Sequence, residues 1–293
     1  APINYAALTV CDGRNRGEVV SEPVPTPWLV YCRPGFASAA LAELQHHAAL
    51  QGIACESSHG EGWVSLTRVD GEAVNDLHRQ AAFKKLIFAR QSLAALPALT
   101  LSRDDRLTAI LEQFKASRWS FEEIWHETPD TNDGKALAGL MKALTKPLES
   151  MLKKRGALRR SAGARRLHIF WTDGDQVQLA MSFPGNRSDL LNGIRRLRFP
   201  SRAPSRSTLK LEEAWHEFIP RDEWDVRLAA HMQAADLGAA PGGWTWQLVQ
   251  RGMYVYAIDN GPMESQLMKT GQIDHLKEDG FTWEPTQRLD WLG

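Results

Sequence analysis

A glycine-rich segment bounded by acidic residues is the part of this sequence whose residue types could do chemistry. It runs Asp236-Leu-Gly-Ala-Ala-Pro-Gly-Gly-Trp244, and Asp259 closes the next apolar run. Hydrophobic spacing and turn residues predict a strand, a turn, a helix and a second strand, over residues 234–237, 238–243, 244–251 and 254–258. An acid about 20 residues after a glycine-rich loop is typical of nucleotide binding at the edge of a doubly wound sheet.

The spacing of this loop discriminates between ligands. A dinucleotide-binding loop has the pattern G-x-G-x-x-G, which rests a pyrophosphate on a helix N-terminus. The loop here reads G-x-x-P-G-G and follows Asp236, whose carboxylate would repel a pyrophosphate. The same carboxylate suits the ammonium and sulfonium charges of S-adenosylmethionine, so the pattern favours this methyl donor over NAD and over a turn that binds nothing. Asp259, at the carboxyl end of the second strand, is expected to accept hydrogen bonds from ribose hydroxyls.

The charge of the chain is unevenly distributed, although its formal net charge is zero. Residues 150–210 contain 14 lysines and arginines but three acids, whereas the remainder has 21 basic and 32 acidic residues. Such a local basic field can attract a polyanion, or it can be a solvated helix face with arginine-rich loops. We expect one exposed cluster within it to contact nucleic acid, positioning phosphates rather than reading sequence. Its members are Arg159, Arg160, Arg165 and Arg166.

The elements that must position these groups follow from hydrophobic periodicity. Between Trp28 and about Ser92 the expected order is strand, helix, strand, strand, helix, strand, which is that of a ferredoxin-like split unit. The strands are expected over residues 28–33, 53–57, 62–68 and 85–89, and the helices over 36–50 and 71–82. The predicted fold class is α/β.

A second α/β region is expected between this unit and the glycine-rich loop. Its elements are helices over 103–117 and 135–155, a strand over 121–127 and hairpin strands over 167–172 and 177–183. Thr131–Asp133 would cap the second helix, and Pro147 would kink or divide it. Residues 200–205 are the best candidate for a linker, and a helix over 208–218 follows.

Composition excludes several classes of protein. Hydrophobic residues make up 43% and charged residues 24% of the chain, as in ordinary globular proteins. The most apolar stretch, Leu93–Leu101, is far shorter than the roughly 20 residues of a membrane span, and the charged residues near the N-terminus do not suit a signal peptide. Cys11, Cys32 and Cys55 are too scattered for a disulfide framework or a zinc site. A cytoplasmic protein without metal is expected.

Other side chains capable of chemistry have plainer interpretations. Trp244 and Trp246 are expected to pack in the core rather than to stack on bases. Four histidines lack the spacing of metal ligands and are expected to be structural or exposed. They are His46, His47, His126 and His168.

Several segments are similar to those of a known family. Asp236–Trp244 resembles motif I of the FtsJ-like ribose 2′-O-methyltransferases, and Ser205–Ala214 resembles the segment that carries the first lysine of their Lys-Asp-Lys-Glu tetrad. Further blocks resemble a bacterial branch of the family that methylates a cytidine ribose in 23S ribosomal RNA. They are Tyr31–Phe36, Leu86–Arg90, Arg198–Pro200, Phe218–Pro220, Asp222–Trp224 and Asp259–Met263. The resemblance extends to about Phe281.

The resemblance implies roles for individual residues. S-adenosylmethionine is the implied cofactor, and the loop pattern already assigns Asp236 and Gly238 to it. The residues that the resemblance implies for cofactor contact are Ser207, Ala240, Pro241, Gly242, Gly243, Asp259 and Asp279. Asp279 would meet the adenine, whereas its Glu-Asp-Gly context alone suggests a turn former. Lys210 would be the first catalytic lysine, beside the reacting 2′-hydroxyl, whereas without the resemblance it would be a solvated helix lysine.

The resemblance also implies the domain organisation and the partner, 23S ribosomal RNA. The expected parts are an extended leader over 1–27, a ferredoxin-like domain over 28–95, an RNA-binding THUMP-like domain over 96–190 and a Rossmann-like methyltransferase domain over 191–293. In the family a further segment with the catalytic aspartate, second lysine and glutamate follows, so we expect this chain to bind the cofactor weakly and not to turn over. The alternative function is an RNA-binding protein with an inactive methyltransferase fold.

Overall fold

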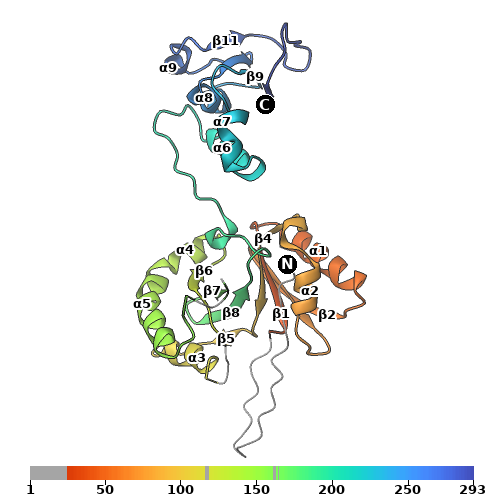
Figure 1. Ribbon diagram of the computed structural model, residues 1–293, viewed down its shortest axis with the longest axis vertical. Helices are drawn as coiled ribbons and strands as arrows, with labels where there is room; N and C mark the ends of the chain where they lie inside the picture. Colours follow the sequence, from red (N-terminus) through yellow and green to blue (C-terminus); the bar gives the residue numbers. More distant parts are fainter. Residues whose placement is uncertain (1–24, 116–118, 161–162, 164) are drawn as a thin grey trace, which may run out of the picture. The chain divides into compact units, whose positions relative to one another are not determined.

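The computed structural model describes residues 25–115, 119–160, 163 and 165–293. The chain divides into two compact units, which we name the N-terminal unit (to Ile194) and the C-terminal unit (from Arg195). Residues 1–24, most of the predicted leader, lie outside the described residues. The fold class is α/β, as predicted, and each unit contains one sheet with helices packed against it (Figure 1).

The first half of the N-terminal unit has the predicted ferredoxin-like order. Its elements are β1 (Pro27–Cys32), α1 (Ala37–Leu50), β2 (Cys55–Gly60), β3 (Trp63–Arg68), α2 (Asn75–Gln80) and β4 (Ala89–Ala95). The strands pair antiparallel in the order β2-β3-β1-β4. Every residue of β1 is buried, because this strand is central and covered on both faces, which explains its unbroken apolar run.

The prediction of a strand over residues 85–89 is wrong. The strand β4 begins at Ala89, and a 3-10 turn (Phe83–Lys85) precedes it. The carboxylate of Glu43 in α1 accepts hydrogen bonds from the backbone N–H groups of Ile87 (2.6 Å) and Phe88 (3.1 Å). These donors are therefore satisfied outside the sheet, and an apolar run that looks like a strand remains a surface loop.

The second half of the N-terminal unit extends the same sheet. Its elements are β5 (Leu99–Thr100), α3 (Arg106–Glu112), β6 (Glu123–Glu127), α4 (Asn132–Ala136), α5 (Ala138–Lys154), β7 (Arg166–Trp171), β8 (Gln176–Ser182) and a 3-10 turn (Leu191–Gly193). The order β2-β3-β1-β4-β8-β7-β6, with β5 beside β8, makes one sheet of eight strands. Figure 1 shows α1 and α2 beside the first half and α3 to α5 beside the second. One hydrophobic core joins them, from Leu44 of α1 to Leu148 and Leu152 of α5.

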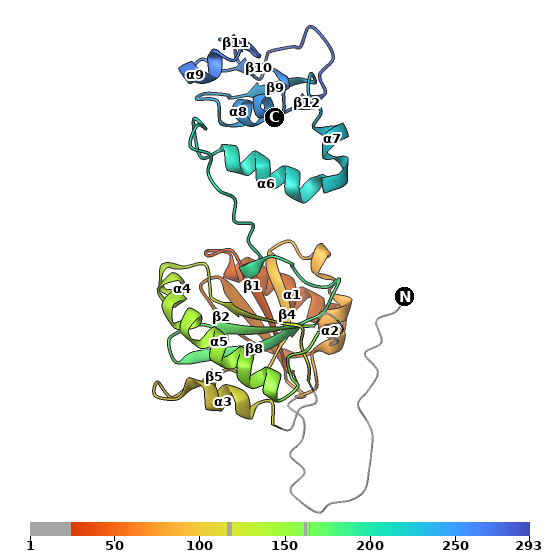
Figure 2. The same ribbon diagram turned by 60° about the vertical axis from the view of Figure 1, so that its left-hand side comes forward.

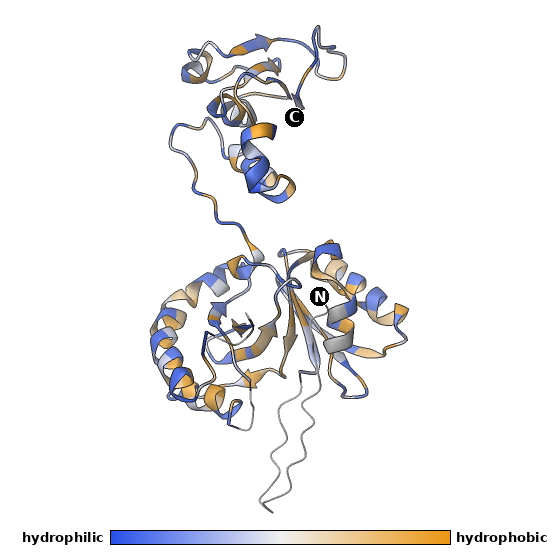
Figure 3. Cartoon of the chain, in the orientation of Figure 1, coloured by the Kyte–Doolittle hydropathy of each residue, from blue (hydrophilic) through white to orange (hydrophobic). Residues whose placement is uncertain are grey.

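Two helices replace the single helix predicted over 135–155, and Pro147 is not the reason. The side chain of Thr131 caps α4 by accepting a backbone hydrogen bond of 3.0 Å, as predicted. The break lies at Leu137, and α5 continues through Pro147. Pro147 and Ala143 are both exposed, so water can bond the Ala143 carbonyl that proline leaves unpaired. Figure 3 shows hydrophilic and hydrophobic residues alternating along α5.

A buried acid ties four strands of the N-terminal unit together. Glu127 and His168 are fully buried. One oxygen of Glu127 accepts from the Tyr31 hydroxyl at 2.9 Å and lies 2.6 Å from His168 Nδ1, and the other accepts from the Asn192 N–H at 2.7 Å. Nε2 of His168 lies 2.7 Å from Ser182 Oγ. This order of serine, histidine and acid is that of a nucleophilic triad, but full burial of all three excludes a substrate and makes the cluster structural.

The C-terminal unit contains the predicted parallel β-α-β arrangement. Its elements are α6 (Thr208–Phe218), a 3-10 turn (Arg221–Glu223), α7 (Trp224–Arg227), β9 (Gln233–Leu237), α8 (Gly243–Gln250), β10 (Tyr254–Ile258), α9 (Ser265–Met268), β11 (Ile273–Leu276) and β12 (Trp291–Leu292). All strands are parallel, in the order β11-β10-β9-β12. Figure 2 shows α6 and α8 on the same side of this sheet. Trp215, Leu248 and Val255 pack there in the core of the unit.

Candidate functional site

The glycine-rich loop joins β9 to α8 at the carboxyl end of the parallel sheet. Gly238 and Gly242 have φ angles of 76° and 114°, which residues with a Cβ rarely adopt. Gly243 is required for another reason, because a Cβ at this position would overlap the hydroxyl of Ser207 at the start of α6. The glycines therefore permit both the turn and the close approach of α6.

A cavity of about 220 Å³ opens beside this loop. Six of the residues predicted for catalysis or cofactor binding line it, namely Ser207, Lys210, Asp236, Gly238, Ala240 and Gly243. Leu237, Ala239 and Trp244 complete the lining. The volume is below the roughly 300–1,000 Å³ of sites that enclose a whole drug-sized ligand, so the cavity suits one end of a ligand the size of S-adenosylmethionine.

Asp236 is the buried charge of this cavity. Its carboxylate is held by Thr245, whose backbone N–H and hydroxyl donate to Oδ2 at 2.8 and 2.6 Å. Burial raises the pKa of Asp236, the two bonds from Thr245 oppose this, and the nearby charge of Asp259 raises it further. In the part of the chain that the structure describes, no donor reaches Oδ1. A carboxylate that is desolvated and half satisfied fits a cationic ligand such as the ammonium end of S-adenosylmethionine.

Asp259 follows β10 at the same edge of the sheet, as predicted. Its two oxygens accept the backbone N–H groups of Ala240 (2.9 Å) and Gly261 (2.6 Å). These two bonds lower the pKa of Asp259, whose side chain is partly exposed. Each carboxylate oxygen has a second lone-pair direction, so the group can still accept a bond from a ligand hydroxyl. The bond to Ala240 also links Asp259 directly to the glycine-rich loop.

Asp279 lies in an exposed turn, where its carboxylate accepts the backbone N–H of Phe281 at 3.0 Å. A Cβ on its neighbour Gly280 would lie 3.4 Å from Leu237 and 3.9 Å from Ile258, the last residues of β9 and β10. This turn therefore packs against the carboxyl ends of the two strands that frame the site, although Asp279 does not line the cavity.

Lys210 projects from the first turns of α6, and its exposed side chain contributes to the rim of the cavity. Trp244 fixes this helix, because its indole N–H donates to the carbonyl of Ser207 at 3.0 Å. Gln247, one turn further along α8, donates to the carbonyl of Thr208 at 3.3 Å. Sequence reasoning assigned Trp244 only to packing, although its place directly after the loop could have indicated a site role.

Two of the predicted loop residues face away from the cavity. The carbonyl of Pro241 accepts the backbone N–H of Glu264 at 3.0 Å. A Cβ on Gly242 would overlap the side chain of Leu267 in α9. The structure thus places Pro241 and Gly242 against α9, and they shape the loop from behind.

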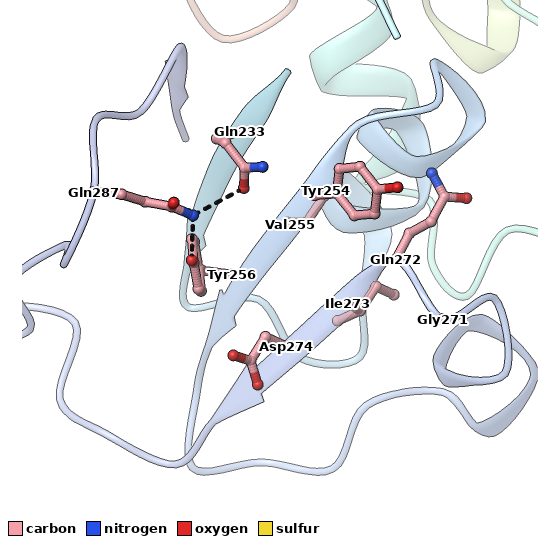
Figure 4. Close-up of a pocket in the computed structure, with 9 residues that line it drawn as sticks. All are labelled: Gln233, Tyr254, Val255, Tyr256, Gly271, Gln272, Ile273, Asp274 and Gln287. Carbon is pink, nitrogen blue, oxygen red and sulfur yellow. Dashed lines mark hydrogen bonds between the residues drawn. The ribbon is translucent and has the colours of Figure 1, made fainter. Parts of the chain in front are cut away.

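A larger cavity, of about 350 Å³, lies on the same sheet and contains none of the predicted site residues (Figure 4). Gln287 closes one end of it by donating to the hydroxyl of Tyr256 (2.5 Å) and to Oε1 of Gln233 (3.3 Å). Its acid, Asp274, is exposed. Figure 4 shows Gln287 bonded to Gln233 and Tyr256, and Asp274, the charged residue of the lining, is exposed, so this cavity lacks a buried reactive side chain.

The arginines predicted to contact nucleic acid have different surroundings. Arg166 is 5% exposed and lies 2.8 Å from the carboxylate of Glu123, and its guanidinium stacks 3.4 Å above the ring of Trp125. Its charge is therefore already paired with an acid, Glu123, whose own side chain is exposed. Arg159 and Arg160 are exposed, and both line a cavity of about 480 Å³ beside β6.

Metal-binding groups and membrane-spanning helices are both absent from the part of the chain that the structure describes. No group of three or more His, Cys, Asp or Glu side chains is arranged to hold a metal ion. No helix there has both the length and the apolar character needed to cross a membrane.

Three family descriptions match successive parts of the chain. Residues 26–93 match the RlmM ferredoxin-like domain, residues 105–183 match the N-terminal part of ribosomal RNA large subunit methyltransferase M, and residues 203–290 match the FtsJ-like methyltransferase. The third match contains the glycine-rich loop and every residue that lines the 220 Å³ cavity.

Relatives are similar over almost the whole chain. Ribosomal RNA large subunit methyltransferase M of Chromohalobacter salexigens is 63% identical, over 92% of this chain and 76% of that protein. The protein of the same name from Marinomonas sp. is 46% identical, over 90% of this chain and 76% of that protein. Among solved structures, TrmN from Thermus thermophilus matches at 18% identity with a TM-score of 0.37, over 86% of this chain and 73% of that one, which is too weak to carry an argument.

Proposed function

Because the chain belongs to the ribosomal RNA large subunit methyltransferase M family, we propose that it transfers a methyl group from S-adenosylmethionine to a cytidine 2′-hydroxyl of 23S ribosomal RNA. The observation that carries this proposal is the cavity at the carboxyl end of β9. There a desolvated carboxylate, Asp236, lies beside an open glycine-rich backbone and Lys210. A pyrophosphate would be repelled by that carboxylate, so a dinucleotide fits poorly.

The cofactor would bind partly inside this cavity and partly along the sheet edge. Asp236 would attract its ammonium group, and the backbone at Gly238 and Ala240 would allow close approach. Asp259 would accept hydrogen bonds from the ribose, and Asp279 would lie at the adenine. Those two acids are outside the cavity, in agreement with a cavity too small for the whole cofactor.

Lys210 would lie beside the reacting 2′-hydroxyl. The cofactor supplies a methyl group on a good leaving group, so removal of the hydroxyl proton is the difficult part of the reaction. A lysine accepts a proton well only where burial or neighbouring cations lower its pKa. Lys210 lies on the exposed rim, and RNA bound against this rim would remove the lysine from water and bring the ribose within reach.

The N-terminal unit would bind the RNA. We assign its residues 28–95 to a ferredoxin-like domain and 96–190 to a THUMP-like RNA-binding domain that together share one sheet. Eight of the 14 basic residues between 150 and 210 lie in this unit, and they supply the attraction for a polyanion. The expected location is the cytoplasm, where ribosomal RNA is available.

Calorimetry with S-adenosylmethionine and NAD tests the cofactor. We expect S-adenosylmethionine to bind and NAD not to bind. Asp236→Asn should weaken binding at least about tenfold, because it removes the charge that faces the ammonium group. Asp274→Asn is the matched control, since this acid is exposed in the same unit and lies outside the site. Tighter binding of NAD, or equal effects of the two substitutions, would contradict the proposal.

Methyl transfer tests the acceptor. Labelled methyl groups that enter 23S RNA and are recovered as 2′-O-methylcytidine after digestion would support the proposed transfer and would overturn the expectation from the sequence that this chain does not turn over. Lys210→Ala should abolish the transfer, whereas Lys269→Ala, at an exposed lysine of the same unit, should not. Methylation of a base instead of a ribose would contradict the assigned acceptor.

A further inference from the structure

Two serine hydroxyls lie against the start of α8, beside the 220 Å³ cavity. The Oγ atoms of Ser205 and Ser207 are 2.6 Å apart, and the backbone N–H of Ser207 donates to Oγ of Ser205 at 3.2 Å. A Cβ on Gly243 would lie 2.7 Å from Oγ of Ser205 and would overlap that of Ser207. The glycine therefore makes room for both hydroxyls, of which Ser207 lines the cavity and Ser205 lies behind it.

The backbone around the two serines is fixed by hydrogen bonds. The carbonyl of Ser207 accepts the indole N–H of Trp244 at 3.0 Å and the backbone N–H of Lys210 at 2.9 Å. The carbonyl of Ser205 accepts the N–H of Thr208 at 3.4 Å. Both serines are half-buried. What remains free is the rotation of the two hydroxyl groups, so the bond between them decides where each proton points.

The direction of this bond follows from the other partners of the two hydroxyls. Each hydroxyl has one proton to donate and two lone pairs that accept. If Ser207 donated to Ser205, the proton of Ser205 would have no acceptor among the residues that the structure describes. If Ser205 donates, its proton is bonded, and the proton of Ser207 is available to a ligand in the cavity. The second arrangement satisfies both protons once a ligand offers an acceptor.

The amino-acid end of S-adenosylmethionine offers such an acceptor. Its ammonium and carboxylate groups are on one carbon atom, so an ammonium group at Asp236 brings the carboxylate into the same cavity. The backbone N–H groups of residues 238–240 already donate to oxygens of the protein. Since the Trp244 indole is also bonded, the side-chain donors left in the lining are Ser207 and the exposed Lys210. The proposed function places Lys210 at the 2′-hydroxyl of RNA, so Ser207 is the donor for the cofactor carboxylate.

We propose that Ser205 is a positioning residue for the cofactor, whose hydroxyl donates to Ser207 and so directs the Ser207 hydroxyl toward the carboxylate of S-adenosylmethionine. This inference rests on the proposed function, because the cofactor supplies the carboxylate. Asp236 at the end of β9 and the two serines before α6 then bind the opposite charges of one amino-acid group. A ligand without the carboxylate should therefore not depend on either serine.

Calorimetry of the whole chain with two ligands tests the inference. Decarboxylated S-adenosylmethionine keeps the ammonium and sulfonium charges of S-adenosylmethionine and lacks its carboxylate. Ser207→Ala should weaken S-adenosylmethionine about tenfold, and Ser205→Ala about threefold to fivefold, because a hydroxyl without its donor can rotate away from the ligand. Neither substitution should change the affinity for the decarboxylated ligand. Asp236→Asn should weaken both ligands alike, because both have the ammonium group.

A double variant separates positioning from direct contact. In a Ser207→Ala background, Ser205→Ala should cause no further loss of affinity for S-adenosylmethionine, because the hydroxyl that it orients is gone. Ser265→Ala is the matched control and should leave both affinities unchanged. Ser265 is an exposed serine at the start of α9, outside the cavity, and its hydroxyl donates to Glu264 at 3.4 Å.

Three results would overturn the inference. Equal losses for the two ligands in Ser205→Ala would show that this serine only shapes the turn before α6. Additive losses in the double variant would show that Ser205 acts independently of Ser207. Unchanged binding of S-adenosylmethionine to Ser205→Ala would show that Ser207 needs no positioning, and it would leave the proposed cofactor standing. Failure of the wild type to bind S-adenosylmethionine would instead reject the proposed function, and this inference with it.

Discussion

Each unit of the molecule contains a buried acid, and the two acids are satisfied differently. In the N-terminal unit Glu127 has both oxygens occupied by protein donors, from Tyr31, His168 and Asn192. In the C-terminal unit both bonds to Asp236 come from Thr245 and go to one oxygen, and the residue lines a cavity. A buried carboxylate that the protein saturates holds the fold, whereas one that it leaves half satisfied is available to a ligand.

Removal of the saturated acid should have the largest effect on stability. Glu127→Ala leaves His168 and the Tyr31 hydroxyl buried without their acceptor, so we expect a loss of about 3–5 kcal/mol in the free energy of unfolding. Urea denaturation followed by circular dichroism measures it. Glu127→Gln, which keeps an acceptor, should cost less. We expect Asp236→Asn to lower the free energy of unfolding by no more than about 1 kcal/mol. An equally small loss for Glu127→Ala would show that the two buried acids do not differ in their contribution to stability.

The next largest effect on stability is expected at His126, which precedes Glu127 in β6. This effect should depend on pH. Burial lowers the pKa of His126 from 6.5 to about 4, and its Nε2 has no partner among the described residues. Because the folded pKa is the lower one, the unfolded chain binds the proton more readily, and stability falls as pH drops from about 6.5 to about 4. The full loss from this group is about 3 kcal/mol.

Unfolding of the wild type and of His126→Asn at pH 7, 5.5 and 4.5 measures this effect. Asparagine can still accept the bond that Trp171 donates to Nδ1 of His126 at 3.1 Å. The difference in stability between the two proteins should shift in favour of the variant as the pH falls. A difference that does not change with pH would mean that His126 binds a proton as readily in the folded protein as in the unfolded chain.

Protonation of Asp236, the half-satisfied acid, should make the affinity for the cofactor depend on pH. Burial raises the pKa of Asp236 above the ordinary value of 3.8, so the carboxylate takes up a proton at a higher pH than an exposed aspartate does. Protonation removes its attraction for a cation, and affinity for S-adenosylmethionine should fall up to about tenfold per pH unit below the folded pKa. Protonation relieves the burial penalty, so this residue would not cause acid unfolding. Calorimetry as the pH is lowered from 7 should show the decline in the wild type and little of it in Asp236→Asn.

The smallest effect is expected at Asp259, an acid outside the cavity. Asp259→Asn should weaken S-adenosylmethionine a few-fold, because an amide still offers one acceptor to a ribose hydroxyl. Bonds from the backbone lower the pKa of Asp259, so its contribution to binding should persist to a lower pH than that of Asp236. Asp236→Asn removes the pH dependence that comes from Asp236, so calorimetry of this variant over the same pH range measures the contribution of Asp259. A steep decline there would show that the two acids do not differ as the comparison requires.

Much of the molecule was predictable because the relevant patterns are local. Helix α6 has the bounds expected from its hydrophobic spacing, and β10 agrees equally well. The strand expected over residues 85–89 does not form, because the carboxylate of Glu43 in α1 accepts the backbone N–H groups of Ile87 and Phe88. Glu43 is distant in the sequence, so no local pattern indicates this contact. The pairing of Glu127 with His168 was also missed, because the two residues are 41 positions apart and no spacing rule connects them.

The sequence by itself determined the glycine-rich loop, its flanking acids and their chemistry, because glycines at positive φ and a carboxylate at a strand end depend on a few adjacent residues. Only the tertiary structure decided what surrounds each side chain. Arg165 and Arg166 are identical in type and adjacent in sequence, yet one shares the hydroxyl of Ser120 with Arg159 and the other is buried against Glu123. Successive residues of an extended chain point to opposite faces, and the strands packed beside them decide which face is the interior.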